Sequence, residues 1–522
     1  MVAIRAEAHY GRVMKCYAER PPHMMAVLAD AVARAPEHVA LVDGARRMTY
    51  AALDAESARI AGNLAARGIA PGDRVAMLIG NSLEFFTVLL ACARIGAIAV
   101  PMGIRLRKPE IAFICSQSGA GMLIHEAGLA AELPDAADAP ELEARIEVGS
   151  EEFEALRRDG PRAPDVAIAE EDTFCILYTS GTTGRPKGAM LTHLGMVHTC
   201  IHWRERLSLR EDTEVALLPI PITHVSGLGG MWAPILFMRG TLVLIQAFKA
   251  RNFLEIAQAE GCTYVLMVPA MYQLCLLEPD VASFDLSSWR LALYGGAPMP
   301  EPTIKRLAEV TPHLQLVNAY GATETTSPTT ITPPGFGVSH ADSIGKAVDC
   351  GEIRVMDDKG CEVVPGQQGE LWIAGPMVVP GYWRNESANE TAFTSGFWKS
   401  GDVGAVDAEG FVRLYDRKKD MISRGGYKIY PAEVESVLTE HPDIIECAIV
   451  GQACPVLGER VHAFVVTKSG TMDAGIVRGF CAPRMADYKV PEFVTVLPDA
   501  LPRNANGKLV KDALRRRLTP AP

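Results

Sequence analysis

The chain has 522 residues, of which 48% are hydrophobic, so it is long enough for about two to four domains with large buried cores. Its 51 basic and 62 acidic residues give a formal net charge of −11. This acidic balance argues against a general nucleic-acid binder, which usually carries a basic excess, but it leaves room for a local basic phosphate site.

The cysteines and the apolar segments indicate a setting inside the cell. The 12 cysteines are scattered, without a C-x-x-C pair or a zinc-like His/Cys spacing, so we expect a reducing, cytoplasmic environment. The N-terminus has no apolar stretch long enough for a signal peptide. The most membrane-like segment, "FFTVLLACARIGAIAVP", carries Arg94 in its middle, so we predict a buried helix and strand instead of a membrane span.

The first part of the chain predicts a βαβ unit. Residues 49–67 read as a helix, because Leu53, Ile60 and Leu64 fall on one face and Gly68 supplies a stop. An apolar strand at 74–80, a helix at 82–94 and a strand at 97–101 follow. Strand, helix and strand in such a short stretch imply a parallel sheet.

Further apolar strands continue this pattern and then give way to a different one. The parallel-type strands are expected at 173–178, 214–221, 241–245, 263–269, 290–296 and 314–321, several of them ending in Gly or Pro loops where α/β sheets bind ligands. After about residue 335, short alternating segments such as "GEIRVMDD", "GELWIAG" and "GFVRLYD" predict antiparallel strands.

A charged connector, "DRKKD" at 416–420, precedes a compact α+β segment. We expect a helix at 431–440 and strands at 444–450 and 462–467 in this segment. The connector therefore marks the predicted domain boundary, with residues 1–416 on one side and 417–522 on the other.

The stretch "TSGTTGRPKG", residues 179–188, has the composition of a phosphate-binding loop. It differs from the G-x-x-x-x-G-K-[ST] pattern, because a proline precedes Lys187 and a glycine follows it. Glycines let the backbone turn tightly, while backbone N–H groups, hydroxyls and the Lys187 ammonium can face an anion. A surface turn without function is the alternative that composition alone leaves open.

Four further motifs occur downstream in a fixed order: "YGATE" (320–324), "WKSGD" (398–402), "YDRKKDMISRGGYKIYPAEVE" (415–435) and "PRNANGK" (502–508). With the loop, this set resembles the adenylate-forming superfamily of acyl-CoA synthetases, peptide-synthetase adenylation domains and luciferases. The resemblance covers essentially the whole chain. It implies an α/β fold in which a large N-terminal domain has mostly parallel sheets flanked by helices and a small β-barrel-like part. A small, mobile C-terminal α+β domain would follow, with a hinge near Lys419.

The same resemblance implies a two-step reaction that uses ATP, Mg²⁺ and coenzyme A. A carboxylic acid attacks the α-phosphate of ATP to give an acyl-adenylate and pyrophosphate, and a thiol then replaces AMP. The positions that match the family's ATP-binding motifs are Thr179, Ser180, Gly181, Thr182, Thr183, Lys187, Gly295, Gly296, Ala297, Asn318, Ala319, Tyr320, Thr323, Asp402 and Arg417.

Within this set the resemblance assigns individual roles. Gly295, Gly296 and Ala297, together with Asn318, Ala319 and Tyr320, would form the adenine pocket, and Arg417 would contact the ribose. Thr323 would contact the α-phosphate, and Glu324 would bind Mg²⁺, since a carboxylate is a hard ligand for a hard cation. Asp402 would accept the ribose hydroxyls, and Lys508 would be the catalytic lysine, whose charge offsets the charge developing in the transition state. His224 joins the catalytic set because it gates or lines the acyl pocket, and no acid–base role is assigned to it.

The implied acyl pocket contains His224, Val225, Gly227 and Gly321. Acetate-type relatives carry a bulky Trp at the place of Gly321, so glycine there implies a larger acid: medium-chain, alicyclic or aromatic. The implied coenzyme A channel contains Gly425, Gly426 and Tyr427, where glycines would let the pantetheine arm pass close to the backbone.

Two rival functions stay open at this point. The chain could load an acyl or aryl group onto a separate carrier protein, or it could bind nucleotide without catalysis. An α/β-hydrolase is disfavoured because the chain contains no G-x-S-x-G. The expected partners are a small carboxylic acid, ATP and coenzyme A, with no nucleic acid and no membrane span; a homodimer is left open.

Overall fold

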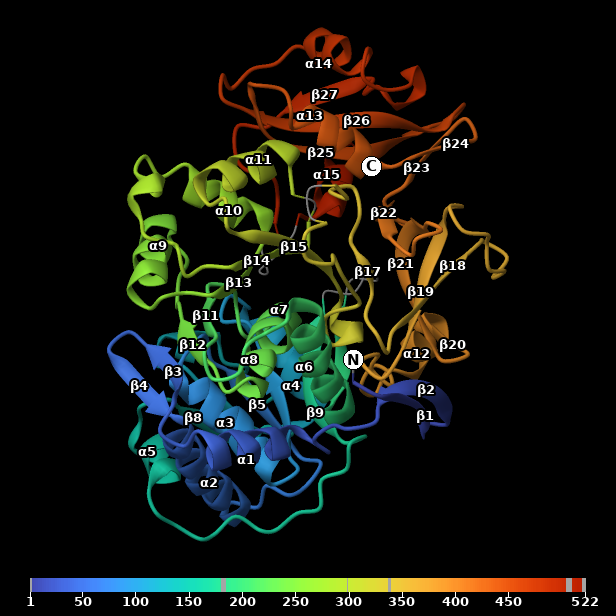
Figure 1. The fold of residues 1–522 in the computed structure, drawn as a ribbon. Helices are drawn as coiled ribbons and strands as arrows, with labels where there is room; N and C mark the ends of the chain where they lie inside the picture. Colours follow the sequence, from blue (N-terminus) through green and yellow to red (C-terminus); the bar gives the residue numbers. More distant parts are fainter. Residues whose placement is uncertain (1, 180–184, 298, 337–338, 504–508, 519–522) are drawn as a thin grey trace. The chain divides into compact units, whose positions relative to one another are not determined.

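A computed structural model describes residues 2–179, 185–297, 299–336, 339–503 and 509–518 (Figure 1). The chain divides into two compact units. Unit 1 consists of Met1–Ile353 and Ile373–Lys399, and unit 2 of Arg354–Trp372 and Ser400–Pro522. The predicted boundary at residue 416 falls within unit 2, because segments that precede the connector cluster with the C-terminal part. The hinge near Lys419 stays a prediction.

The βαβ pattern of the first part builds a six-stranded sheet in unit 1. Its order is β10-β9-β6-β5-β7-β8. The strands are β5 (Arg74–Leu78), β6 (Ile98–Pro101), β7 (Ala120–His125), β8 (Ala144–Glu147), β9 (Thr173–Thr179) and β10 (Lys187–Thr192). Neighbouring strands from β9 to β8 pair in parallel, whereas β10 returns antiparallel along β9.

Helices of unit 1 begin where the sequence supplies a capping side chain. Thr49 caps α2 (Tyr50–Ala66), since its Oγ1 accepts the Ala52 N–H at 3.2 Å. Ser82 caps α3 (Leu83–Arg94) in the same way. Helices α2 and α3 pack on each other and on α1 (Met24–Arg34). The other helices of the first 210 residues are α4 (Lys108–Ser118), α5 (Glu151–Arg157) and α6 (His193–Leu207).

The membrane-like segment is a buried helix and strand, as predicted. It forms α3 and β6, and the Arg94 guanidinium at the end of α3 is ion-paired with Asp54 of α2. Among the described residues, no helix is both long and apolar enough to cross a membrane.

A nine-stranded sheet of unit 1 contains the other predicted parallel strands. Its order is β17-β16-β15-β14-β13-β11-β12-β3-β4, with parallel pairing from β15 to β3. The strands are β3 (Val39–Asp43), β4 (Arg46–Thr49), β11 (Val215–Leu218), β12 (Thr241–Leu244), β13 (Tyr264–Met267), β14 (Leu291–Tyr294), β15 (Gln315–Tyr320), β16 (Thr330–Ile331) and β17 (Lys346–Ala347). The helices among them are α7 (Val225–Gly227), α8 (Ala233–Phe237), α9 (Ala250–Ala259), α10 (Pro269–Leu276) and α11 (Glu301–Val310).

Short strands follow after about residue 335, as expected. They form a sheet of order β18-β19-β21-β20, with β22 beside β21. The strands are β18 (Glu352–Met356), β19 (Gly369–Ala374), β20 (Phe393–Thr394), β21 (Phe397–Val406) and β22 (Val412–Arg417), and α12 (Glu386–Ala392) lies between β19 and β20 in sequence. Strand β21 pairs antiparallel with both β20 and β22.

The last hundred residues form the predicted α+β fold within unit 2. A sheet of order β24-β23-β26-β25, with β27 beside β26, carries its own apolar core. Its elements are β23 (Ile422–Arg424), β24 (Tyr427–Ile429), α13 (Pro431–Leu438), β25 (Ile444–Cys454), β26 (Gly458–Thr467), α14 (Ala474–Cys481), β27 (Phe493–Val496) and α15 (Lys511–Leu518).

The first described residues form an antiparallel hairpin that the sequence analysis did not predict, β1 (Ile4–His9) and β2 (Arg12–Tyr17).

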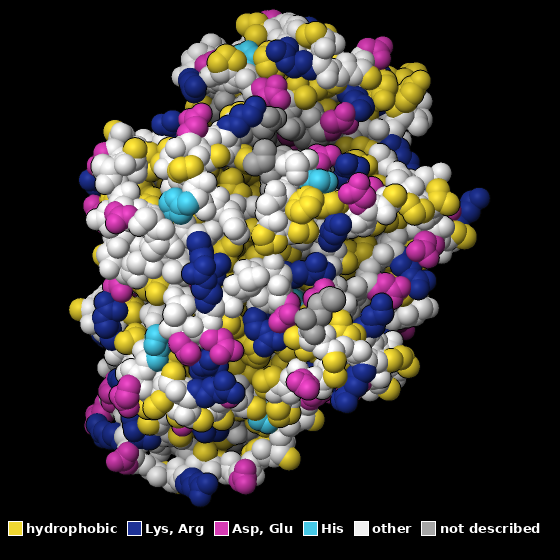
Figure 2. All heavy atoms as spheres, in the orientation of Figure 1, with side chains coloured by type: hydrophobic (Ala, Val, Ile, Leu, Met, Phe, Trp, Pro, Cys, Tyr) yellow, Lys and Arg dark blue, Asp and Glu magenta, His cyan; other side chains and the backbone are white. Residues whose placement is uncertain are grey.

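On the face drawn in Figure 2, basic and acidic side chains are interspersed, so the net negative charge is not gathered into one patch there.

Candidate active site

The phosphate-type loop joins two antiparallel strands instead of opening a helix. Thr179 ends β9 and lies directly opposite Lys187, the first residue of β10. The Thr179 Oγ1 donates a hydrogen bond to the Lys187 carbonyl at 3.4 Å. Both side chains are half-buried. The hairpin therefore places Thr179 and Lys187 as cross-strand neighbours at the base of the loop.

Several predicted site residues lie outside the described residues. These are Ser180, Gly181, Thr182, Thr183 and Lys508. Their roles stay predictions from the motifs.

The predicted magnesium ligand lies on a tight turn after β15. Glu324 sits in the 3₁₀ turn Thr323–Thr325, and the Thr325 Oγ1 accepts the Ala322 N–H at 3.0 Å. The Glu324 side chain is held in a largely buried place, since the residue is only 8% exposed. Thr323 is half-buried beside it. Because the Thr325 side chain closes this turn, the turn fixes the direction in which the Glu324 carboxylate points.

Tyr382 contacts both Glu324 and Lys187, and the sequence analysis did not identify it. Its hydroxyl donates a hydrogen bond to the Glu324 Oε1 at 2.8 Å. The Lys187 Nζ lies 5.1 Å from the centroid of the same ring, within range of a cation–π interaction. The residue lies far from both partners in sequence, so no local pattern could have indicated these contacts.

The predicted adenine-side residues lie at the ends of β14 and β15. A Cβ on Gly295 would lie 2.3 Å from the Ala319 carbonyl oxygen, so only glycine fits this close approach. Gly296 has φ +76°, a left-handed conformation that favours glycine, and Ala297 is exposed. Burial raises the pKa of Tyr294, directly before this turn, to about 12, which keeps the phenol neutral.

The other adenine-side residues lie on β15 itself. Asn318 pairs in parallel with Tyr294, and its Nδ2 donates to the Ser343 carbonyl at 3.2 Å. Ala319 and Tyr320 pair antiparallel with β16. The structure thus brings the two adenine-side motifs together at neighbouring strand ends, as a shared site requires.

The predicted acyl residues surround a helix start and a strand end. His224 is the residue before α7, Val225 begins this helix, and both are half-buried. A Cβ on Gly227 would lie 2.5 Å from the Pro221 carbonyl oxygen, which explains the glycine. Gly321 is exposed directly after β15.

A π-helical turn, Leu228–Trp232, separates α7 from α8. Such turns release backbone carbonyls from the regular ladder and are frequent at functional sites. Here the Trp203 Nε1–H donates to the Gly229 carbonyl at 3.1 Å, and the Tyr264 hydroxyl donates to the Gly230 carbonyl at 2.5 Å. The turn is therefore fixed by two buried aromatic donors.

Unit 2 contains the predicted ribose residues. Asp402 on β21 lies opposite Arg417 on β22 and is 3% exposed. Lys419 follows β22 and is exposed, in the turn where the Asp420 N–H donates to the Arg417 carbonyl at 2.9 Å. The two residues of the proposed ribose contact are thus neighbours within this unit.

The predicted coenzyme A residues form the turn between β23 and β24. Gly425 and Gly426 have φ +57° and +90°, which favour glycine. The Tyr427 ring stacks on Tyr488 with centroids 4.4 Å apart, and Tyr427 is exposed. The turn thus exposes backbone and an aromatic face, as a pantetheine-binding surface would require.

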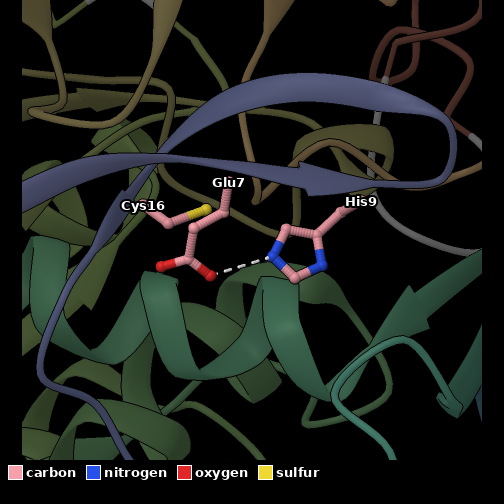
Figure 3. A group of neighbouring side chains, drawn as sticks. All are labelled: Glu7, His9 and Cys16. Atoms are coloured by element: carbon pink, nitrogen blue, oxygen red, sulfur yellow. Dashed lines mark hydrogen bonds and ion pairs between the residues drawn. The ribbon is translucent and has the colours of Figure 1, made fainter.

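One other group of described side chains could in principle hold a metal ion: Glu7, His9 and Cys16 of the N-terminal hairpin (Figure 3). Both Glu7 oxygens already accept from the Arg20 guanidinium, at 2.9 and 2.7 Å, and this contact holds the pKa of Glu7 well below its usual range. Burial raises the pKa of the Cys16 thiol to about 12. A metal would have to displace a guanidinium and deprotonate a buried thiol, so the group is a structural ion-pair network.

Comparisons with known proteins identify the family. The AMP-binding enzyme family model matches residues 28–383, and the AMP-binding enzyme C-terminal domain model matches residues 433–508. The chain is 37% identical over 483 residues to a feruloyl-CoA synthase of Amycolatopsis sp, covering 92% of this chain and 96% of that protein. It is 35% identical over 476 residues to the long-chain-fatty-acid–CoA ligase FadD13 of Mycobacterium tuberculosis, covering 90% and 93%.

Solved structures of CoA synthetases are similar to this chain along almost its whole length. The o-succinylbenzoate CoA synthetase (MenE) of Bacillus subtilis, in complex with the acyl-adenylate intermediate OSB-AMP, has a TM-score of 0.85 and 31% identity, covering 97% of this chain and 99% of that one. The same enzyme in complex with ATP and magnesium ion has a TM-score of 0.84 and 32% identity, covering 94% and 98%.

Proposed function

Since the chain belongs to the AMP-binding enzyme family and is an AMP-forming acyl-CoA synthetase, we propose that its acid is bulkier than acetate, with aromatic carboxylic acids as the first candidates. ATP-dependent activation to an acyl-adenylate, followed by transfer to coenzyme A, is the reaction of this class.

The observation that carries the proposal is the exposed strand end at Gly321, which has no side chain to close the acyl site. Aromatic acids come first because feruloyl-CoA synthase and an indoleacetate–CoA ligase are among the similar proteins, the latter at 35% identity. Medium-chain and alicyclic acids are the next candidates. The half-buried His224 and Val225 would line one side of the acyl group.

We propose that Glu324 holds Mg²⁺. The donor chemistry fits, because a carboxylate is a hard ligand and its Oε2 can face a cation while Oε1 accepts from Tyr382. When bound, Mg²⁺ supplies neutralising charge to the phosphate oxygens.

Other residues of the chain bind the phosphates and the ribose of ATP and orient the acid. Lys187 donates to the phosphates and to departing pyrophosphate, where preoriented donors stabilise developing charge. Thr179 donates to them when its hydroxyl turns away from the Lys187 carbonyl. The Thr323 hydroxyl donates a hydrogen bond to the α-phosphate, and Asp402 accepts hydrogen bonds from the ribose hydroxyls. Lys508 directs the attacking carboxylate toward the α-phosphate.

Coenzyme A is the proposed acceptor in the turn at Gly425, Gly426 and Tyr427. The alternative of loading a carrier protein is not favoured, because the similar proteins named above are all CoA synthetases or CoA ligases. All 12 cysteines lie in the described residues and are free, which suits a reducing compartment, and we propose the cytoplasm. A homodimer stays an untested prediction.

The test is pyrophosphate release across a panel of carboxylic acids, each with and without coenzyme A and with Mg²⁺ or EDTA. We expect aromatic acids to give the highest kcat/KM, with release abolished by EDTA and an acyl-CoA product when coenzyme A is present. Selective turnover of acetate would overturn the assignment of the acid. Adenylate formation without any CoA thioester would overturn the acceptor.

A further inference from the structure

A single segment of unit 1, residues 377–383, contacts both the strand that carries Lys187 and the turn that carries Glu324. At one side it pairs with β10: the Trp383 N–H donates to the Gly188 carbonyl at 2.8 Å, and Tyr382 forms an antiparallel bridge with Ala189. At the other side the Val379 N–H donates to the Glu324 carbonyl at 2.9 Å. The segment therefore joins the strand of Lys187 to the turn of Glu324 through backbone bonds.

The side chain of Tyr382 reaches both functional groups from this segment. Its hydroxyl donates to the Glu324 Oε1 at 2.8 Å, and its ring lies under the Lys187 ammonium with 5.1 Å between Nζ and the ring centroid. Only 4% of Tyr382 and 8% of Glu324 is exposed, so their hydrogen bond is shielded from bulk water, whereas Lys187 is half-buried. Interactions with charged groups strengthen where water is excluded.

The place of Tyr382 is itself fixed on both sides of its backbone. The Asn389 Oδ1 accepts the Tyr382 N–H at 2.6 Å, and the Asn389 Nδ2–H donates to the Tyr382 carbonyl at 3.1 Å. The Phe393 ring packs edge-on against the Tyr382 ring, with centroids 5.7 Å apart. A side chain held this firmly can transmit its position to the groups that it touches.

From these contacts we infer that Tyr382 is a positioning residue for the adenylation step: its hydroxyl orients the Glu324 carboxylate and its ring orients the Lys187 ammonium. The inference rests on the proposed role of Glu324 toward Mg²⁺ and of Lys187 toward the phosphates. Tyr382 touches neither metal nor substrate in this scheme. It sets the geometry between a cation ligand on the turn after β15 and a phosphate donor on β10.

Two substitutions separate the two contacts. Tyr382→Phe removes the hydroxyl and keeps the ring, whereas Tyr382→Leu removes both. The first readout is the Kd for Mn²⁺, a paramagnetic substitute for Mg²⁺, measured by electron paramagnetic resonance with a non-hydrolysable ATP analogue. The second readout is the KM for ATP in acid-dependent pyrophosphate exchange.

We expect Tyr382→Phe to weaken Mn²⁺ binding by about tenfold, the usual effect of losing a hydrogen bond to a charged group, and to change the KM for ATP much less. Tyr382→Leu should weaken Mn²⁺ binding equally and additionally raise the KM for ATP about threefold, because the cation–π contact to Lys187 is lost. Equal KM values in the two variants would overturn the role of the ring. An unchanged Mn²⁺ affinity in Tyr382→Phe would overturn the role of the hydroxyl.

Tyr50→Phe is the matched control, because Tyr50 is also buried and its hydroxyl donates to the Gly240 carbonyl at 2.7 Å. It should lose a similar amount of thermal stability with unchanged Mn²⁺ affinity. Comparable weakening of Mn²⁺ binding in this control would mean that any buried tyrosine acts through stability alone, which overturns the inference.

Glu324→Gln distinguishes failure of the inference from failure of the proposed function. If Glu324→Gln weakens Mn²⁺ binding, adding Tyr382→Phe to it should have no further effect, because the hydroxyl acts through that carboxylate. Additive effects of the two substitutions would overturn the inference alone. Unchanged Mn²⁺ affinity in Glu324→Gln would overturn the metal role of Glu324, and the inference with it.

Discussion

Asp402 and Arg417 face each other across the antiparallel strands β21 and β22, and the Arg417 Nε lies 2.7 Å from the Asp402 Oδ1. The carboxylate is buried while the guanidinium extends to an exposed surface. This pair holds an acceptor in a fixed direction within one hairpin. A rigid carboxylate of this kind suits recognition of two neighbouring hydroxyls, as the ribose of ATP would require.

The first prediction concerns Asp402→Asn. We expect the KM for ATP in pyrophosphate exchange to rise about tenfold or more, since a hydrogen bond to a charged group contributes about 1.5–3 kcal/mol. The preference for ATP over 2′-deoxy-ATP should shrink at the same time. Asp407→Asn is the control, because Asp407 belongs to the same hairpin and accepts from the Phe411 N–H at 2.9 Å. A wild-type preference between the two nucleotides in Asp402→Asn would refute the ribose contact.

The second prediction concerns Gly321→Trp. We expect preference to shift toward very short acids, with larger acids losing about tenfold in kcat/KM, because steric overpacking costs about 1–3 kcal/mol and each 1.4 kcal/mol is a decade. The structure adds a stability cost, since a Cβ here would lie 3.3 Å from both the Ser327 and the Pro328 Cα. The measurement is kcat/KM across the acid panel.

Gly321→Ala is the matched variant for that test. Its methyl group meets the same backbone but is too small to fill an acyl site, so it should lower the melting temperature and leave acid preference unchanged. An equal loss of stability in both variants, with no change in acid preference, would show that Gly321 does not border the acyl group.

The third prediction is a loss of stability in mild acid that comes from the histidines of α6. Burial lowers the pKa of His198 to about 4 and that of His193 to about 3. The Tyr17 N–H donates to the His198 Nε2, and the Met24 N–H donates to the His193 Nδ1, so both rings must stay neutral to anchor the N-terminal segment. His202, fully buried on the same helix, also has a pKa well below its ordinary value because of burial.

The sign follows from proton binding. Unfolded histidine has a pKa near 6.5, so below about pH 6.5 the unfolded chain binds more protons than the native one. The stabilising contribution of each such histidine should be complete above that pH. As the pH drops toward 4, the free energy of unfolding should fall by about 1.4 kcal/mol per pH unit for each of them. Urea unfolding at pH 7.5, 6 and 5 measures this. His198→Gln should make the free energy of unfolding depend less steeply on pH, whereas His313→Gln, at an exposed position, should not. An equal pH dependence in the wild type and both variants would contradict the prediction.

The sequence predicts most of the elements because their patterns are local. The parallel strands and the caps at Thr49 and Ser82 depend on residues a few positions apart. Gly295 and Gly425 are also identified from local motifs, and the structure explains why glycine is needed at each: a close backbone approach at Gly295 and a left-handed backbone conformation at Gly425.

The positioning contacts could not be predicted, because they are tertiary. Tyr382 and Glu324 are 58 positions apart in sequence, and nothing in "GYW" indicates this partner. Likewise "KGAMLT" gives no sign that it returns antiparallel along β9, and the π-helical turn depends on distant aromatic donors such as Trp203. Motifs therefore identify the chemical groups, whereas the fold decides what orients them.

The fourth prediction tests the hinge proposed at Lys419. Lys419→Pro fixes φ and disfavours helical backbone at the preceding residue, so it should stiffen the exposed turn after β22. We expect CoA thioester formation from supplied acyl-adenylate to fall more than adenylation does, each measured separately. Lys419→Ala removes the side chain without restricting the backbone and should leave both steps near wild type. Equal losses in the two steps of Lys419→Pro would argue against a pivot at this position.

The fifth prediction concerns Lys508, which the motif "PRNANGK" identifies as the catalytic lysine and which belongs to unit 2. If it acts only in adenylation, Lys508→Ala should slow acid-dependent pyrophosphate release by about 10²–10³, since losing a donor to a developing charge costs about 2.7–4 kcal/mol. Thioester formation from synthetic acyl-adenylate should be largely preserved. ATP affinity should change modestly, because Thr179 and Lys187 belong to unit 1 and stay in place.

Lys468→Ala provides the control for a lost lysine in the same unit, since the exposed Lys468 Nζ donates to the Pro442 carbonyl at 2.7 Å and has no proposed catalytic role. It should leave both half-reactions unchanged. Preservation of the thioester step in Lys508→Ala is the decisive observation, because a lysine needed only for folding or for general nucleotide binding would slow both steps together. If both half-reactions fell alike, or if adenylation stayed intact, Lys508 would not be the residue that divides the two steps, and the predicted mobility of the small C-terminal domain would lose its main support.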